Sequence, residues 1–186
     1  MEFESPKLVN HVVEFEQLEQ HKKLIKGDDL FLCLGSTINK AGSRRKFYQN
    51  DFVYNFRMAQ IASTNKVNQL FLVSATGADE NAIMFYYRVK GALENTVQKL
   101  SFWSIHIVRP SLLLDHHAKK SFAERLTHNM SRFLNFLPVE LTEKFQPIEA
   151  ATVAQALVTA AQKLDEGVHI YENDELEKMT VSNFLK

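Results

Sequence analysis

The chain has 186 residues, of which 45% are hydrophobic, which is enough for one domain with a buried core. Lysine plus arginine equals aspartate plus glutamate, at 22 each, so the formal net charge is zero. This balance argues against a dominant role in binding nucleic acid or an anionic membrane, because both need an excess of positive charge. The single cysteine, Cys33, excludes a disulfide within the chain and favours a reducing compartment. We therefore expect a cytoplasmic protein, with no membrane-spanning stretch and no secretory signal.

The first third of the chain predicts two strands separated by a helix. Residues 8–15 (LVNHVVEF) predict a strand, and residues 16–26 predict a short surface helix that ends before Gly27. Residues 30–34 (LFLCL) are a short uninterrupted apolar run, which is typical of a strand buried on both faces of a parallel sheet.

Residues 36–49 predict a long polar loop with a basic cluster. Asn50 and Asp51 can then cap a helix, because Asn and Asp are favoured at helix N-caps. Apolar residues recur at helical spacing after them, at Phe52, Phe56, Ala59 and Ala62.

The remainder continues the alternation. The expected elements are a strand at 70–73, a helix that contains Tyr86 and Lys90, a strand at 104–108, a helix at 149–163 and a strand at 167–171. An apolar stripe between 122 and 137 fits a lid, a dimer face or plain core equally well. We therefore expect one domain over residues 1–186, with 115–147 as its substrate-side or lid region.

Strand–helix alternation of this kind predicts an α/β fold, a parallel sheet with helices on both faces. Ligands bind such sheets at the carboxyl ends of the strands. Three polar turns follow predicted strands and would meet at that edge: residues 35–37, 74–77 and 109–111.

Tyr86 and Lys90 are four residues apart, so on one helix they share a face. A phenol beside a fixed ammonium can act as a proton donor near neutral pH. Ser74, at the end of the preceding strand, could hold a substrate carbonyl in front of it. From spacing alone an ordinary helix pair would be the preferred interpretation, and it is the surrounding motifs that favour a site.

Other polar groups favour structural interpretations. The neighbouring His116 and His117 point in different directions and lack a third ligand, so no metal site is predicted. Cys33 fits a small buried apolar residue better than a nucleophile. The basic residues at 40–46 could contact a cofactor phosphate or an acidic substrate, although a charged run is more often a solvated loop.

Five segments resemble, in order and at colinear spacing, the atypical short-chain dehydrogenase/reductases. Within them, the similarity is to the small NAD(P)-binding Rossmann oxidoreductases that resemble the Tat-interacting oxidoreductase-like proteins. The segments are CLGSTINKAGS (33–43), LVSATGAD (72–79), FYYRVKGALE (85–94), VRPSLLL (108–114) and QPIEAATVAQAL (146–157). The resemblance runs from about Pro6 to about Glu175.

This resemblance implies roles for particular residues. Ser74 would align the substrate carbonyl, and Tyr86 would be the general acid/base. Lys90 would hydrogen-bond the nicotinamide ribose and lower the pKa of Tyr86 from its usual value near 10. The cofactor would be NADP or NAD and the substrate a small carbonyl or alcohol. Further implied cofactor contacts are Glu14 and Phe15 beside the adenine, Gly35, Ser36 and Thr37 beside the ribose, and Arg109, Pro110 and Ser111 along the nicotinamide pocket.

The glycine pattern departs from the family. Its members begin with a strand, a Gly-rich turn and a helix, which bind the pyrophosphate, followed by a second strand. The six glycines of this chain form no such motif. We therefore expect a Rossmann-like sheet truncated at the N-terminus, without a strand–helix–strand unit of roughly 30 residues or more. Three arrangements are consistent with this: a truncated product, a unit supplied by another chain, or direct pairing of residues 8–15 with 30–34.

Two functions from different classes follow. The first is an NAD(P)-dependent oxidoreductase that uses Ser74, Tyr86 and Lys90. The second is a non-catalytic Rossmann-like regulatory or interaction module that has lost the phosphate-binding loop. We expect neither nucleic acid nor a membrane as a partner, and an exposed sheet edge would favour a homodimer.

Overall fold

The computed structural model of the chain describes residues 5–114 and 146–181. The described residues contain a four-stranded sheet in the order β1–β2–β3–β6, with every neighbouring pair parallel. The strands are β1 (Asp29–Leu32), β2 (Gln69–Val73), β3 (Ser104–Arg109) and β6 (Gly167–Glu172). Two short strands, β4 (Leu113–Leu114) and β5 (Ile148–Glu149), form a separate parallel pair.

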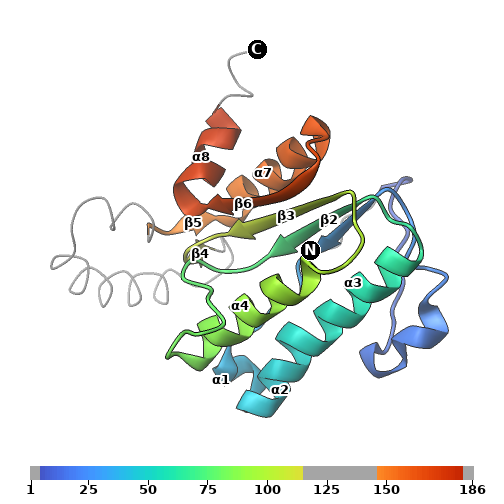
Figure 1. Ribbon diagram of the computed structural model, residues 1–186, viewed down its shortest axis with the longest axis horizontal. Coiled ribbons are helices and arrows are strands. Elements are labelled where there is room, and N and C mark those ends of the chain that lie inside the picture. Colours follow the sequence, from blue (N-terminus) through green and yellow to red (C-terminus); the bar gives the residue numbers. More distant parts are fainter. Residues whose placement is uncertain (1–4, 115–145, 182–186) are drawn as a thin grey trace, which may run out of the picture.

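Helices cover both faces of the sheet (Figure 1), which confirms the predicted α/β class. α3 (Asn55–Thr64) and α4 (Phe85–Val97) lie on one face. α7 (Ala150–Lys163) and α8 (Asn173–Val181) lie on the other. Successive side chains of a strand point to opposite faces of the sheet. An apolar strand covered on both faces therefore contributes side chains to both layers of the core.

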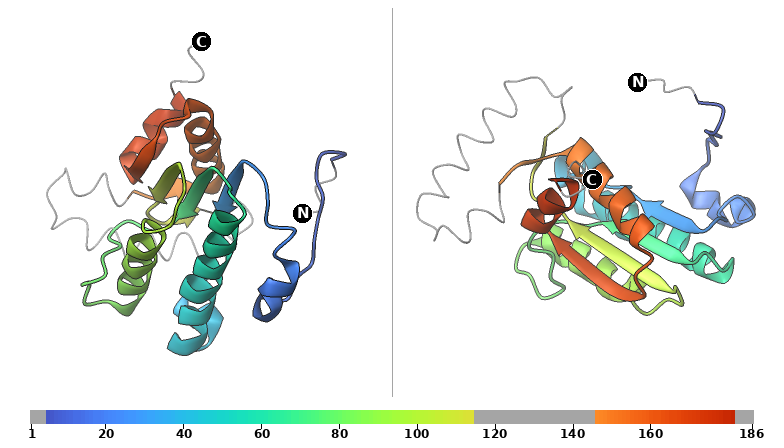
Figure 2. Two further views of the ribbon diagram at one scale, coloured as in Figure 1. Left: turned by 45° about the vertical axis from the view of Figure 1, so that its right-hand side comes forward. Right: turned by 90° about the horizontal axis from the view of Figure 1, so that it is seen from above.

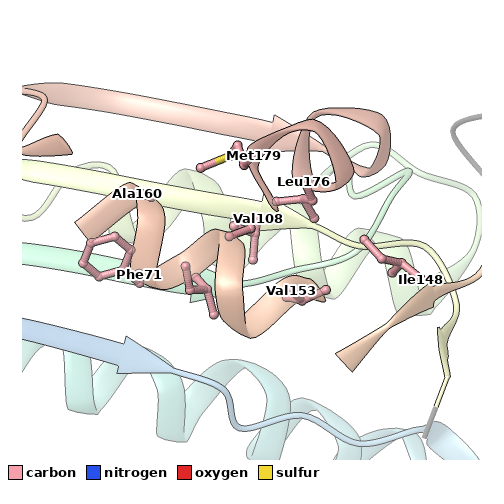
Figure 3. Packing of buried hydrophobic residues seen from close by; sticks show 9 residues of the cluster. Phe71, Val108, Ile148, Val153, Ala160, Leu176 and Met179 are labelled. Atoms are coloured by element: carbon pink, nitrogen blue, oxygen red, sulfur yellow. The ribbon is translucent and has the colours of Figure 1, made fainter. Parts of the chain in front are cut away.

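The strand β2 shows this division. Leu70 and Leu72 pack in the cluster with α3 and α4, whereas Phe71 packs in the cluster with α7 and α8. Figure 3 shows the second cluster, in which Phe71 and Val108 of the sheet lie beneath the two helices. All three β2 side chains have at most 1% of their surface exposed, which explains the uninterrupted apolar run in the sequence.

Figure 1 places the carboxyl ends of the strands, the start of α4 and two short helices at the same end of the molecule. The short helices are α1 (Ile38–Ala41) and α2 (Arg44–Tyr48), and a π-helix, η2 (Gln49–Tyr54), joins α2 to α3. The prediction of a long loop over 36–49 is therefore wrong. Thr37 and Ser43 each accept a backbone N–H three residues later, so both short helices have side-chain N-caps.

The predicted strand at 8–15 is absent from the structure. Residues 5–14 form no strand, and Phe15 begins a 3₁₀ helix, η1 (Phe15–His21). Figure 2 shows η1 beside α3, and the residues before it extend away from the sheet. Val12 is 97% exposed, so its apolar side chain has no layer to pack against. Within the described residues β1 pairs with β2 alone, and pairing of 8–15 with 30–34 is not observed.

Of the helices in the described ranges, none has both the length and the apolar character needed to cross a lipid bilayer.

Candidate functional site at the carboxyl ends of β1 and β2

Small polar residues lie shortly after the ends of β1 and β2, at Ser36 and Ser74. Leu32 and Leu72 are partners in the parallel register, and the segment 34–36 and Ser74 come next on the two strands. The backbone N–H of Ser74 donates to the carbonyl of Val108 at 2.8 Å, so the ladder extends to Ser74. Strand alternation then places the Ser74 side chain on the same face as Leu72, which is the face covered by α3 and α4.

A buried ion pair lies at the centre of the site. Lys90 Nζ of α4 is 2.9 Å from Asp51 Oδ1 of η2, and the two side chains are 5% and 0% exposed. Asp51 also accepts the backbone N–H of Ser36 at 3.0 Å and the Ser36 hydroxyl at 2.8 Å. A buried charge costs free energy unless it is paired and hydrogen-bonded, and these contacts meet that requirement for the carboxylate.

Asp51 is a residue of the site that the sequence reasoning missed. It was predicted to cap a helix, but it lies inside η2, where a π-helical turn replaces the expected helix start. π-helical turns are rare and are frequent at functional sites, because the extra residue per turn redirects a side chain. The sequence of residues 49–54 contains no pattern that predicts a π-helical turn.

Gly35 lies against the ion pair. A Cβ atom added at Gly35 would lie 3.5 Å from both Asp51 Oδ1 and Lys90 Nζ, and the residue itself is exposed. A ligand that approaches the Gly35 backbone therefore comes close to the Lys90 ammonium. The structure thus brings together Gly35, Ser36 and Lys90, three of the residues predicted to contact a cofactor.

Tyr86 lies one turn before Lys90 on α4, with its ring centroid 6.0 Å from Lys90 Nζ. Its ring packs against Phe47 at 5.5 Å and Tyr87 at 5.2 Å. Burial raises the pKa of Tyr86 to about 12, and the charge of Asp51 adds to this effect. This is opposite to the lowering expected from Lys90: burial is the largest cause of the shift, and the nearby ammonium is paired with Asp51. The phenol is in its acid form at neutral pH.

Ser74 and Thr76 differ in their partners. The Ser74 hydroxyl is buried and has no hydrogen-bond partner among the described residues. The Thr76 hydroxyl donates to the carbonyl of Arg109 at 2.8 Å. A buried hydroxyl without a partner is unfavourable unless a ligand or water supplies one, so Ser74 is the better candidate for a substrate contact.

The predicted nicotinamide-pocket residues are occupied in structural contacts. Arg109 forms ion pairs with Glu94 at 2.6 Å and Glu172 at 2.9 Å, which raise the pKa of its guanidinium. The carbonyl of Pro110 accepts from the backbone of Thr76. Ser111 donates its hydroxyl to the Gln146 carbonyl and its backbone N–H to Asn173. These contacts tie the end of β3 to α4, β6 and α8.

Three further predicted residues lie elsewhere. Thr37 accepts the backbone N–H of Lys40 and begins α1. Glu14 precedes η1, where its carboxylate accepts from Gln17 at 2.9 Å. Phe15 stacks on Tyr54 at a centroid distance of 5.1 Å. Glu14 and Phe15 do not end a strand, so that part of the prediction is wrong, whereas their contact with an adenine stays a prediction.

Cys33, which was predicted to be buried, is exposed at the end of β1. Among the described residues no group of three or more His, Cys, Asp or Glu side chains could hold a metal ion. His116 and His117 lie outside the described residues, as does most of the proposed lid region at 115–147.

No protein-family model matches the chain. It is 35% identical over 155 residues to the mitochondrial protein FMP52-1 of Scheffersomyces stipitis, covering 80% of this chain and 68% of that protein. It is 30% identical over 148 residues to protein HTATIP2 of Rattus norvegicus, covering 79% of this chain and 59% of that protein. The chain thus spans about three-fifths to two-thirds of the length of these relatives. Several FMP52 proteins are named as mitochondrial, so the prediction of a cytoplasmic location is wrong.

Solved structures show the same fold at low identity. MoeE5, in complex with UDP-glucuronic acid and NAD, matches with a TM-score of 0.63 at 12% identity and covers 92% of this chain and 67% of that chain. A short-chain dehydrogenase/reductase superfamily protein from Agrobacterium tumefaciens with bound NAD matches with a TM-score of 0.59 at 13% identity, covering 90% of this chain and 68% of that chain. The described sheet and helices therefore have the Rossmann architecture of NAD-binding enzymes.

Proposed function

The chain belongs to the family that includes HTATIP2 and the FMP52 proteins, and from this we propose that it is an NAD(P)-dependent oxidoreductase of the short-chain dehydrogenase/reductase type. The observation that carries the proposal is the buried Lys90 ammonium, which lies next to Gly35 and one helical turn from a protonated Tyr86. The NAD and NADP complexes among proteins of similar fold support the cofactor class.

The site fits the nicotinamide side of a dinucleotide. Lys90 has an ammonium with three N–H donors, and Asp51 is its single ion-pair partner among the described residues. Ribose hydroxyls are suitable acceptors for the remaining donors, and Gly35 leaves the approach open. The chain has no Gly-rich turn for the pyrophosphate, so the proposal assigns only these contacts.

Each residue has a defined task in the proposed reaction. Ser74 holds the substrate carbonyl with its unpartnered hydroxyl. Tyr86 donates its phenolic proton to the carbonyl oxygen when the substrate is reduced, and it takes the proton back when an alcohol is oxidised. Lys90 binds the cofactor and fixes the position of Tyr86 relative to it. The bound nicotinamide would supply or accept the hydride.

Replacing Tyr86 with Phe tests this assignment. The variant keeps the ring that packs on Phe47 but removes the proton donor, so we expect turnover to fall roughly 10²- to 10⁴-fold with NADPH binding retained. Turnover is measured as loss of NADPH absorbance with a panel of aldehydes, ketones and quinones. Tyr87→Phe is the control, because the neighbouring phenol has no assigned proton transfer.

Equal turnover by the wild type and Tyr86→Phe would remove Tyr86 from the mechanism. Binding of NADPH without turnover of any tested carbonyl would favour the second candidate, a non-catalytic Rossmann-like module. A homodimer remains a prediction: β1 leaves one edge of the sheet unpaired within the described residues, and Phe31 beside it is 41% exposed. Sedimentation velocity would test it.

A further inference from the structure

Asp51 connects two elements that carry different parts of the proposed site. Its carboxylate receives the Ser36 backbone N–H and hydroxyl from the loop after β1. The same carboxylate is 2.9 Å from Lys90 Nζ on α4. Asp51 has no exposed surface, Lys90 is almost fully buried, and Ser36 is half-buried.

A purely structural role would require only that Asp51 stabilise the fold, and a buried ion pair is weak evidence for that role. Well-packed apolar residues often replace such pairs with no loss of stability, because the desolvation of two charges offsets much of their attraction. The position of this pair is more informative. It lies beside Gly35, whose backbone is exposed, and beside the Tyr86 ring.

We propose that Asp51 is a positioning residue of this site, which holds Lys90 and the loop at 35–37 in one arrangement and places a buried negative charge close to the Tyr86 ring. The inference rests on the proposed function for its meaning, since Lys90 and Tyr86 are the residues that the proposed reaction uses. The contacts of Asp51 on which it is based lie within the chain, so they can be tested without cofactor or substrate.

The groups around Tyr86 support this assignment of charge. η2 contributes Asp51, and α4 contributes Lys90 and Tyr87. α2 faces the ring with the apolar Phe47, while its Arg44 lies over Phe85 instead. Burial is the largest cause of the raised pKa of Tyr86, and the Asp51 carboxylate and Tyr87 add to it.

The test is the ionisation of Tyr86 in the Asp51→Asn variant. Asparagine keeps the shape and an acceptor for Ser36 but removes the charge. Tyrosinate absorbance is recorded by stopped-flow pH jump, before alkaline unfolding, and Tyr86 is isolated as the difference between each protein and its Tyr86→Phe counterpart. We expect the Tyr86 midpoint to fall measurably in Asp51→Asn, and to stay at its wild-type value in Asp51→Glu, which retains the charge.

A second pair of variants covers the case in which Asp51→Asn does not fold because it leaves Lys90 unpaired. Lys90→Gln is compared with the double variant Asp51→Asn/Lys90→Gln, which contains no buried unpaired charge. The double variant is expected to ionise Tyr86 at lower pH than Lys90→Gln. Equal midpoints within either comparison would overturn the proposal. These titrations are independent of turnover, so failure of the oxidoreductase assignment and failure of this inference can be told apart.

Discussion

His106 lies in the middle of β3 and has no exposed surface. Its ring stacks between Phe71 at 4.6 Å and His169 at 5.0 Å, in register across the sheet. Ser104 donates to the carbonyl of Asp165, so its hydroxyl oxygen accepts from His106 Nε2, and Nδ1 accepts from the Tyr171 hydroxyl. Both nitrogens of a neutral imidazole are therefore satisfied. Burial lowers the pKa of His106 to about 4.

This environment predicts a loss of stability in mild acid. Between pH 6.5 and about 4 the unfolded chain binds a proton at this histidine and the folded chain does not. The contribution is therefore complete above pH 6.5 and is lost as the pH falls toward 4, with a size of up to about 3 kcal/mol. Urea unfolding at pH 7 and pH 4.5 measures it. His106→Gln should show a smaller difference between the two pH values, and an unchanged difference would contradict the assignment.

Some individual residues of the site could be predicted from the sequence, and others could not. Tyr86 and Lys90 could be predicted, because helical spacing and flanking motifs place them on one face. Asp51 could not, because an Asp before an apolar helical run is typical of an N-cap, and the π-helical turn that turns it inward depends on tertiary packing. Glu14 and Phe15 were misplaced because their implied role required a strand that this chain does not form.

The elements that could be predicted best are those whose own residue pattern is sufficient to identify them. β2 is apolar from Leu70 to Val73 and is covered on both faces, so the run itself predicts the strand. Residues 8–15 have strand-forming valines, but a strand needs a neighbour, and neighbours cannot be read from a local pattern. α8 was missed although it carries signals: acidic residues in its first turn, and Leu176 and Met179 three residues apart on its buried face.

The packing of α4 predicts that Gly91 cannot be replaced. A Cβ atom there would lie 2.3 Å from the backbone carbon of Asp79 and 2.4 Å from the backbone nitrogen of Glu80. Because backbone cannot move aside as a side chain can, we expect Gly91→Ala to destabilise the fold by about 1–3 kcal/mol, although alanine favours helices. Thermal or urea unfolding measures this. Gly35→Ala is the matched control, since its Cβ makes only ordinary contacts and stability should change little.

Greater stability of Gly91→Ala than of the wild type would mean that helix propensity outweighs the close approach of α4 to the loop at 78–80. The same contact bears on the site, because the backbone N–H of Asp79 donates to the carbonyl of Tyr87, next to Tyr86.

In the molecule as a whole, the polar groups of the candidate site lie together at one end of the parallel sheet. Three segments far apart in the sequence, at 34–36, 51 and 86–90, meet there because β1, η2 and α4 end or begin at the same edge (Figure 1). The alternation of strands and helices predicted this end as the ligand-binding edge. The apolar layers on both faces hold the sheet that positions it.

The most direct test of the proposed function is calorimetric titration of the wild-type chain and Gly35→Val with NADPH and NADH. The backbone of Gly35 lies outside the left-handed region, so valine is compatible with its conformation, but its side chain would cover the Lys90–Asp51 pair. We predict saturable binding of one dinucleotide by the wild type, at least tenfold weaker binding by Gly35→Val, and no change in Lys99→Met, which alters an exposed lysine away from the site. Absence of binding by the wild type at millimolar concentration, or equal binding by Gly35→Val, would contradict the proposal.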